Sequence, residues 1–248
     1  MSSAPASPRP RARAAKAAPA PVEPTSGTPA SETPPAGRRS AELRVYLLVE
    51  NLRRQFTAAM AAPTRARGYP PYEGQHALIV EVAPGLAIER VIDLALRAVP
   101  SVEPGILFVE RQFGVLEVHG SSLDDVRRAG QAILDGIGAS AGDQLRPRIL
   151  YTDVIEEITD QHAVLVNRNR QASMVLPGET LLVCEMTPAL FATVAANEAE
   201  AAAPDITLVD VQMIGSAGRL YISGRPGSVR AARDAIVRVL ESVEGRDH

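Results

Sequence analysis

Apolar and polar positions change period several times after residue 41, and each change predicts an element. Residues 76–82 are a short β-rich run that predicts a strand. Residues 84–99 predict a helix with Pro84 in its first turn, because apolar side chains recur there at helical spacing. Residues 102–110 and 115–119 predict the strands of a hairpin around a tight connection at 111–114. Ser122 with Asp125 resembles a capping box that opens a second amphipathic helix.

The same order of elements then recurs. Strand 180–186, helix 188–202, hairpin 206–223 around residues 215–218, and a helix from 226 to about 240 follow one another. Each set is preceded by an additional strand and short helix, within residues 43–60 and 148–158. The pattern β-α-β-α-β-β-α, twice, predicts an α/β (α+β) fold of two antiparallel sheets, each with helices on one side.

Identical residues at a constant offset show that the two sets are diverged copies of one domain. The offset is 104 residues, and the matched pairs are Pro84 and Pro188, Pro100 and Pro204, Gly114 and Gly218, Leu116 and Leu220, and Gly120 and Gly224. We therefore predict a first copy at residues 42–144 and a second copy at 145–248.

Residues 1–41 have a different composition from the rest of the chain. Nine of the twenty prolines lie there, with almost no large apolar residue, so the segment is predicted to be disordered. It carries six basic and two acidic side chains, which leaves a net charge of about −7 on the remainder. Docking of this tail onto an acidic partner stays a hypothesis, and a solvated tail is favoured.

Composition argues against several kinds of partner. The acidic body, the absence of Trp and the 4% aromatic content disfavour nucleic-acid binding. No stretch reaches the roughly 18 apolar residues of a membrane span, and no signal peptide is recognised, so we expect no membrane partner and a cytoplasmic location. Cys184, the only cysteine, lies in a strand-like run and is predicted to be a buried thiol.

Catalytic and metal sites are not predicted. His76, His119, His162 and His248 show no metal-binding spacing, and no cofactor fingerprint is present. Acidic pairs at 124–125 and 156–157 lie near predicted helix starts, where negative charge is favourable without any catalytic role. The chain is therefore predicted not to be an enzyme, with no catalytic residues, no metal and no cofactor.

Three runs carry a specific resemblance to a known family. They are VAPGLAIERV at 82–91, VERQFGVL at 109–116 and HAVLVNR at 162–168. These resemble the trimeric shell proteins of bacterial microcompartments in which two circularly permuted domains are fused, most closely the α-carboxysome member. The similarity covers about residues 42–243, and the early position of the additional strand and helix in each copy agrees with the permutation.

The resemblance implies an assembly and a transport function. Three chains would form a flat pseudohexamer, a homotrimer that tiles with other hexameric shell proteins in a carboxysome shell. The hairpin tips would line a central gated pore for metabolites such as ribulose bisphosphate and phosphoglycerate. Two trimers can stack face to face in this family, and the polar run 167–171, interpreted as a loop, is assigned to the trimer or stacking surface as a hypothesis.

The two hairpin tips are the candidate site because the copies diverge there. The first tip consists of Glu110, Arg111, Gln112, Phe113 and Gly114, and the second of Gly215, Ser216, Ala217 and Gly218. By resemblance, Glu110 and Arg111 are the gate pair. An arginine can extend into an opening or fold back onto a carboxylate, and its guanidinium binds phosphate bidentately.

Alternative interpretations stay open at this stage. Glu110–Arg111 can be an ordinary solvated turn, and residues 215–218 can form either a backbone anion nest or, as we favour, a plain tight hairpin. From another class, tandem ferredoxin-like regulatory domains that bind a small ligand share this pattern of elements. Such domains would carry their distinctive residues at a helix–loop interface rather than at a hairpin tip.

Overall fold

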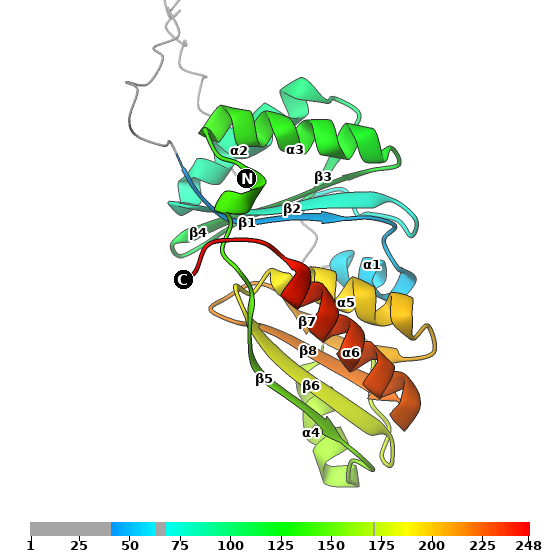
Figure 1. The fold of residues 1–248 in the computed structure, drawn as a ribbon. Helices are drawn as coiled ribbons and strands as arrows, with labels where there is room; N and C mark the ends of the chain where they lie inside the picture. Colours follow the sequence, from blue (N-terminus) through cyan, green and yellow to red (C-terminus); the bar gives the residue numbers. More distant parts are fainter. Residues whose placement is uncertain (1–40, 63–67, 171) are drawn as a thin grey trace, which may run out of the picture. The chain divides into compact units, whose positions relative to one another are not determined.

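Two four-stranded antiparallel sheets with the same strand order form the framework of the protein (Figure 1). The structure is a computed structural model that describes residues 41–62, 68–170 and 172–248. The disorder predicted for residues 1–41 therefore falls outside the described residues except at Ala41, which is buried.

The eight strands divide evenly between the copies. Sheet 1 has the order β1-β2-β4-β3 and sheet 2 the order β5-β6-β8-β7. Every pairing is antiparallel. The strands are β1 (Glu42–Val49), β2 (His76–Ala83), β3 (Glu103–Glu110), β4 (Phe113–Gly120), β5 (Arg148–Ile155), β6 (Thr180–Thr187), β7 (Thr207–Gln212) and β8 (Gly218–Gly224).

Two long helices cover one face of each sheet, as predicted. Helices α2 (Ile88–Ala98) and α3 (Leu123–Ile137) lie on sheet 1, and α5 (Phe191–Ala202) and α6 (Pro226–Ser242) lie on sheet 2 (Figure 1). Alternate strand residues such as Leu78, Val80 and Leu116 enter the core under α2 and α3. We call the opposite face of each sheet its outer face. Short helices lie there, α1 (Arg54–Met60) on sheet 1 and α4 (Asp160–Asn169) on sheet 2.

Two predicted helix starts are wrong for the same reason. Pro84 is not in the first turn of α2; it precedes a 3₁₀ turn, η1 (Gly85–Ala87), and its carbonyl accepts the first bond of that turn from Ala87. Pro188 is placed likewise, and α5 begins only at Phe191. A proline has the φ value of either helix type, so its presence marks the start without distinguishing a 3₁₀ turn from an α-helix.

The short helix of the second copy also differs from its prediction. Strand β5 continues to Ile155, and α4 begins after Thr159, whose side chain accepts a bond from His162 N. Three residues predicted to lie in a polar loop, 167–169, therefore form the last turn of α4, while Gln171 lies outside the described residues. Asn167 bonds the backbone N–H and C=O of Val175, so it fixes the following segment instead of facing solvent.

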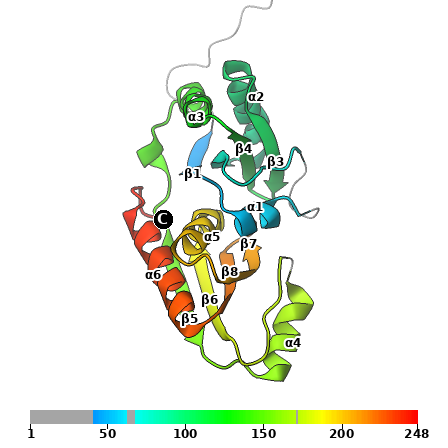
Figure 2. The same cartoon turned by 90° about the vertical axis from the view of Figure 1, so that its right-hand side faces the viewer.

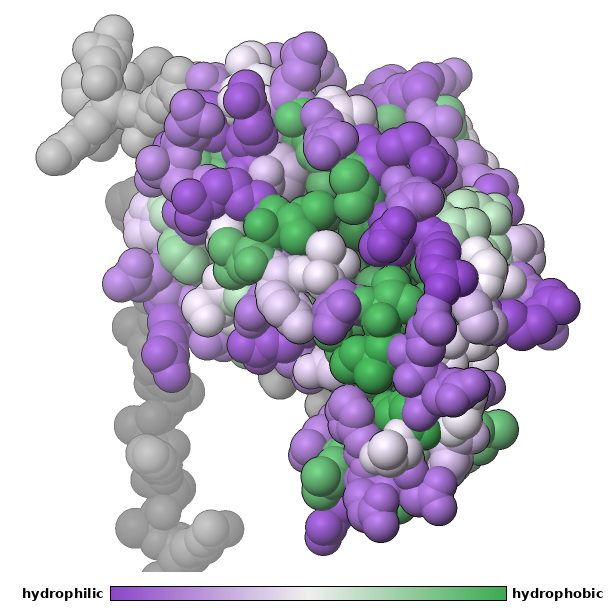
Figure 3. Space-filling model, turned by 60° about the horizontal axis from the view of Figure 1, so that its bottom comes forward, coloured by the Kyte–Doolittle hydropathy of each residue, from purple (hydrophilic) through white to green (hydrophobic). Residues whose placement is uncertain are grey.

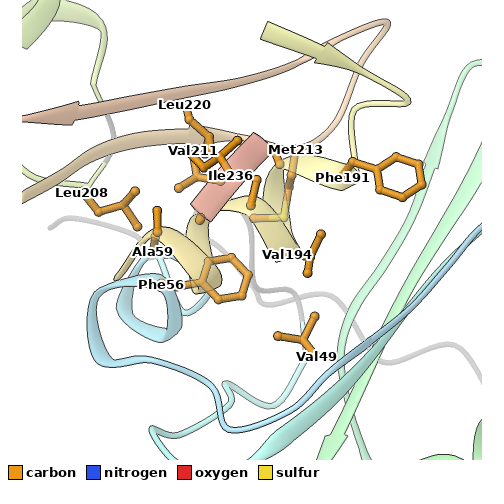
Figure 4. Close-up of a cluster of buried hydrophobic side chains, with 14 of the residues drawn as sticks. Val49, Phe56, Ala59, Phe191, Val194, Leu208, Val211, Met213, Leu220 and Ile236 are labelled. Carbon is orange, nitrogen blue, oxygen red and sulfur yellow. The ribbon is translucent and has the colours of Figure 1, made fainter. Parts of the chain in front are cut away.

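Helix α5 lies between the two sheets (Figure 2). It contacts β6, β7 and β8 of its own sheet on one side, and β1 and α1 of the first copy on the other. We call the contact of α5 and β7 with α1 and the outer face of sheet 1 the intrachain seam. Its apolar side chains, among them Val49, Phe56, Ala59, Phe191 and Val194, belong to one buried cluster (Figure 4).

Polar groups fix the register of the intrachain seam. The Glu200 carboxylate, on α5, accepts bonds from the N–H groups of Gln55 at 2.9 and 3.0 Å and of Phe56 at 3.0 Å. These N–H groups lie in the first turn of α1, where no intrahelical acceptor exists. Asn197 accepts from the N–H of Arg53, and the Gln55 side chain pairs with the edge of β7 at Leu208 N and Ile206 O. The second copy thus caps a helix of the first.

Candidate functional site

The hairpin tips of the two copies meet, although they lie 104 residues apart in the sequence. A cavity of about 360 Å³ is lined by Glu110, Arg111, Gln112 and Phe113 from the first tip and by Gly215 and Ser216 from the second. Gly114 is the second residue of the returning strand β4, Gly218 is the first residue of β8, and Ala217 immediately precedes β8. The structure therefore gathers both predicted sets of tip residues into one place.

The two tips have different backbones. The first connects β3 to β4 through Arg111 and Gln112 alone, whereas the second spans residues 213–217 and is longer than the tight hairpin we predicted. At matched positions the backbone is left-handed in both, with φ of 49° at Arg111 and 134° at Gly215. Glycine adopts such angles without a Cβ clash, whereas a non-glycine residue there is strained. Arg111 is therefore held in an unfavourable conformation by the strands on either side.

Arg111 projects away from the protein. Its side chain is 91% exposed, and its Nε lies 3.6 Å from Glu110 Oε1, longer than a hydrogen bond. Glu110 itself is more sheltered, at 32% exposed. An ion pair of this geometry in water contributes little to stability, so it does not lock the arginine. The guanidinium can leave the carboxylate at low energetic cost.

Phe113, in contrast, is anchored to the sheet. The Arg44 guanidinium lies 3.8 Å from the centre of its ring, a cation–π distance. Arg44 also donates to Glu81 at 2.8 Å. Burial raises the pKa of the Glu81 carboxyl, and the bond from Arg44 opposes that rise. An exposed arginine therefore projects from a tip whose base is held by side chains of β1 and β2.

The two glycines shared by the tips are required by close packing. A Cβ on Gly114 would lie 2.2 Å from the carbonyl oxygen of Gly85, and one on Gly218 would lie 2.3 Å from that of Ala189. The returning strand thus touches the backbone of the turn that precedes α2 in the first copy and α5 in the second. This contact explains why the copies agree at Gly114 and Gly218 while their tips diverge.

Sequence reasoning missed Arg44 and Glu81, which support the first tip. A signal existed, since Glu81 and Glu185 match at the 104-residue offset and both lie within strands. Each is paired with an arginine of a different neighbouring strand, Arg44 of β1 in one copy and Arg219 of β8 in the other. The recurring glutamate could have been noticed, but its partner depends on strand pairing.

Several titratable groups are buried away from the tips. Cys184 is buried as predicted, and burial raises the pKa of its thiol to about 11. His119 is buried too, with Nδ1 3.0 Å from Glu117 Oε1. Among the residues that the structure describes, no group of three His, Cys, Asp or Glu side chains is placed to hold a metal ion, and no helix is long and apolar enough to cross a membrane.

Comparison with known proteins identifies the family. Residues 43–143 match the family model described as the CsoS1D N-terminal domain. The chain is 42% identical over 207 residues to the carboxysome shell protein CcmP of Synechococcus elongatus, a match that covers 84% of this chain and 95% of CcmP. With relatives of this kind, the interpretation as tandem regulatory domains is set aside.

Solved structures give the same fold over the same region. The double ringed trimeric shell protein MSM0271 from the RMM microcompartment is 69% identical with a TM-score of 0.81, covering 84% of this chain and all of that one. The fused permuted hexameric shell protein MSM0275 from the same compartment is 45% identical with a TM-score of 0.78, covering 83% of this chain and all of that one. The chain therefore belongs to the family of permuted, tandem-domain shell proteins of bacterial microcompartments, and it is a structural component of the shell rather than an enzyme.

Proposed function

We propose that three copies of this chain form a pseudohexameric ring in the shell, with the hairpin tips of all six domains around a central pore. The observation that carries the proposal is the cavity shared by Arg111 of one tip and Gly215 of the other. If the contact between copies is repeated around a ring, every tip reaches the same axis. The trimeric relative at 69% identity supports a ring of three chains.

The gate in this proposal is the pair Glu110 and Arg111. Arg111 is almost fully exposed on a tip that Phe113 and Gly114 hold rigidly, so its side chain can move without the sheet. Three guanidinium groups near one axis repel one another unless a carboxylate or an anion lies between them. Folding back onto Glu110 opens the pore, and extension toward the axis narrows it.

The solute favoured by such a gate is a small anion, above all a phosphorylated metabolite. Guanidinium groups bind phosphate through two parallel hydrogen bonds, and a second tip of small residues leaves room beside them. Ribulose bisphosphate and phosphoglycerate fit this class if the shell is that of a carboxysome.

The degree of similarity to known shell proteins supports a proposal for the type of compartment. A carboxysome protein is 42% identical to this chain, whereas a protein of the RMM microcompartment is 69% identical. We favour a shell of the RMM kind and keep the carboxysome as the alternative. Mass spectrometry of the enzymes that co-purify with intact shells would distinguish them, since ribulose bisphosphate carboxylase is expected only in a carboxysome.

Stacking of two rings is a further part of the proposal, supported by the double-ringed relative. The last turn of α4 and its C-cap carry Arg168 and Arg170, and we assign them to the contact between rings. Charge reversal of both should halve the mass of a stacked particle. An unaltered mass would remove these arginines from the contact.

Permeability of assembled shells tests the gate. Shells are built with the wild-type chain or with Arg111→Ala, and exchange of a labelled sugar phosphate is compared with that of a neutral sugar of similar size. Loss of a charge-assisted contact of about 1.5 kcal/mol should lower the preference for the anion roughly tenfold. Arg111→Lys, which keeps the charge, should lose less.

The matched control is Arg233→Ala, which removes a partly exposed arginine of α6 that does not line the cavity. It should leave both rates at their wild-type values. Unchanged permeability to the sugar phosphate in Arg111→Ala shells would remove Arg111 from the mechanism.

A further inference from the structure

Three large apolar side chains, those of Leu86, Tyr151 and Leu165, are exposed. The counterpart of each in the other copy is buried in the intrachain seam. We propose that these residues form an interchain seam, in which α4 and the outer face of sheet 2 of one chain pack against α2 of the next. The inference rests on the ring of three chains proposed above, and it adds which surfaces join the chains and that their contact is more polar than the intrachain seam.

Strand register defines the first counterpart. Tyr151 pairs with Glu185 across β5 and β6, and Val45 pairs with Glu81 across β1 and β2. Since Glu185 and Glu81 match at the 104-residue offset, Tyr151 is the counterpart of Val45. Val45 is fully buried beneath the second copy, whereas Tyr151 is 55% exposed.

Backbone hydrogen bonds define the second pair of counterparts. Leu52 N bonds Gln75 O before α1, and Ile158 N bonds Glu179 O before α4. The N-caps, Arg53 of α1 and Thr159 of α4, follow one residue later. Counting from these N-caps, Leu165 of α4 is the counterpart of Ala59 of α1. Ala59 is 2% exposed in the intrachain seam, and Leu165 is 58% exposed.

The third counterpart lies on the other side of the seam. Ala87 N bonds Pro84 O and Phe191 N bonds Pro188 O, which aligns Leu86 with Leu190. Leu190 is 1% exposed and packs in the cluster between the copies, while Leu86 is 74% exposed. Exposed apolar residues thus occur on both halves of the surface that a repeated seam would use. The end of the molecule that carries α4 shows hydrophobic residues scattered among hydrophilic ones (Figure 3).

One residue shows that the correspondence is specific. Val164 precedes Leu165 on α4 and is also 58% exposed. Its counterpart is Ala58, which stays exposed on α1 even with the second copy in place. The repeated seam would therefore bury Leu165 and leave Val164 in water.

Charged residues replace apolar ones across the proposed contact. Asp153 stands on the outer face of sheet 2 where sheet 1 has Leu47, because these residues pair with Val183 and Ile79 respectively. Arg219 likewise replaces Val115. On the helix side, Arg90 of α2 replaces the buried Val194 of α5. The proposed contact would therefore gather charged side chains of both signs, which makes the association of the chains dependent on salt.

Helix capping also differs between the intrachain seam and the proposed interchain seam. Glu200, which caps α1 across the intrachain seam, is replaced by Leu96 on α2. Helix α4 does not need a cap from a neighbour, because its own Thr159 accepts from His162 N at 3.4 Å. Each chain can therefore complete its fold before the ring closes.

Two neighbouring substitutions test the proposal. Leu165→Asp should convert the ring into folded monomers, measured by native mass spectrometry and circular dichroism, while Val164→Asp should keep a multiple of three chains. A trimer that survives Leu165→Asp would overturn the interchain seam. If the wild-type chain is not a trimer or stacked trimer, the proposed ring itself fails, and this result is distinguishable from the former.

A mixing experiment tests the direction of the contact. Leu86→Asp blocks the α2 side and should also give monomers. An equimolar mixture of Leu86→Asp and Leu165→Asp chains retains one intact seam, so a one-to-one complex is expected although neither variant associates alone. No complex in the mixture would contradict the head-to-tail arrangement.

Salt gives an independent measurement on the wild-type chain. Raising sodium chloride from about 0.1 to 1 M shortens the screening length from roughly 10 to 3 Å. The protein concentration at which half the rings dissociate should rise at least about tenfold, with circular dichroism unchanged. A concentration that does not rise would contradict the polar character of the seam.

Discussion

The outer faces of sheet 1 and sheet 2 have the same strand order but different chemistry. On sheet 1, Leu47 and Val115 are buried beneath α5. On sheet 2 the matched positions carry Asp153 and Arg219, which is 46% exposed. A contact made within one chain can be apolar, because it forms as the chain folds. A surface that contacts a second chain is exposed to water before the chains associate, so charged residues there keep the free chain soluble.

The hairpin tips likewise contain positions that packing keeps the same in both copies and positions that differ. The glycines that touch the neighbouring turn, Gly114 and Gly218, are shared because the packing of both sheets requires them. Residues ahead of them face the cavity and have diverged into a charged tip and a small one. Duplication thus keeps the positions that hold the domain together and allows change where the domain meets its surroundings.

Removal of the cap across the intrachain seam should have the largest effect on stability. Glu200→Ala leaves the N–H groups of Gln55 and Phe56 without their acceptor at a largely buried site. Since each orphaned group costs about 1–3 kcal/mol, the free energy of unfolding should fall by about 3 kcal/mol. Urea unfolding followed by circular dichroism measures this.

Glu198→Ala is the matched control, because Glu198 lies on the same helix and is only half-buried. It should change the free energy of unfolding by less than about 0.5 kcal/mol. Equal losses in the two variants would show that the cap does not hold the copies together.

A methyl group at the close approach behind the first tip should have the next largest effect. The Cβ of Gly114→Ala would lie 2.2 Å from Gly85 O and 2.5 Å from Ile88 Cβ, so β4 must move away from the turn. Such overpacking typically costs about 2 kcal/mol. Thermal unfolding should show the loss, and Gly218→Ala should behave alike because the second copy has the same contact.

The control for this steric effect is Gly142→Ala, where an added Cβ meets nothing within 4 Å. Its stability should stay near the wild-type value. If Gly114→Ala is as stable as Gly142→Ala, the tip is looser than the packing indicates, and a rigid base for Arg111 is lost from the proposed gate.

Periodicity and repetition were enough to predict the sheets, the hairpins and the two tip segments. Both are local signals, since alternation marks a strand and the 104-residue offset aligns one copy with the other. The helix starts were misplaced because Pro84 fits the 3₁₀ turn as well as the α-helix. Domain boundaries at 144 and 145, the gate and the pore stay predictions.

Contacts between distant segments could not be predicted from the sequence. Arg44 touches Glu81 and Phe113 only because β1 pairs with β2, and Glu200 reaches Gln55 across 145 residues. One signal of the intrachain seam was present in residues 191–196, which are almost all apolar. A helical segment without a polar face is typically buried on every side, as residues 191–196 of α5 are.

The smallest expected effect concerns a buried pair that only the first copy contains. Glu117 and His119 face each other on β4, where the second copy has the neutral residues Tyr221 and Ser223. Burial raises the pKa of the Glu117 carboxyl, and the bond with His119 opposes that rise. The protonated carboxyl therefore contributes to stability below the ordinary pKa of 4.5, and this contribution is lost as pH rises through the raised pKa of the folded protein. Glu117→Gln cannot ionise, so its melting temperature relative to wild type should increase between pH 4 and pH 7. Asp125→Asn should show the opposite trend in a more acidic range, losing to wild type as pH rises to the ordinary carboxyl value of 3.8, because the bond from Ser101 lowers the pKa of Asp125 in the folded protein. Parallel melting curves for Glu117→Gln and wild type would mean that the copies do not differ in this respect.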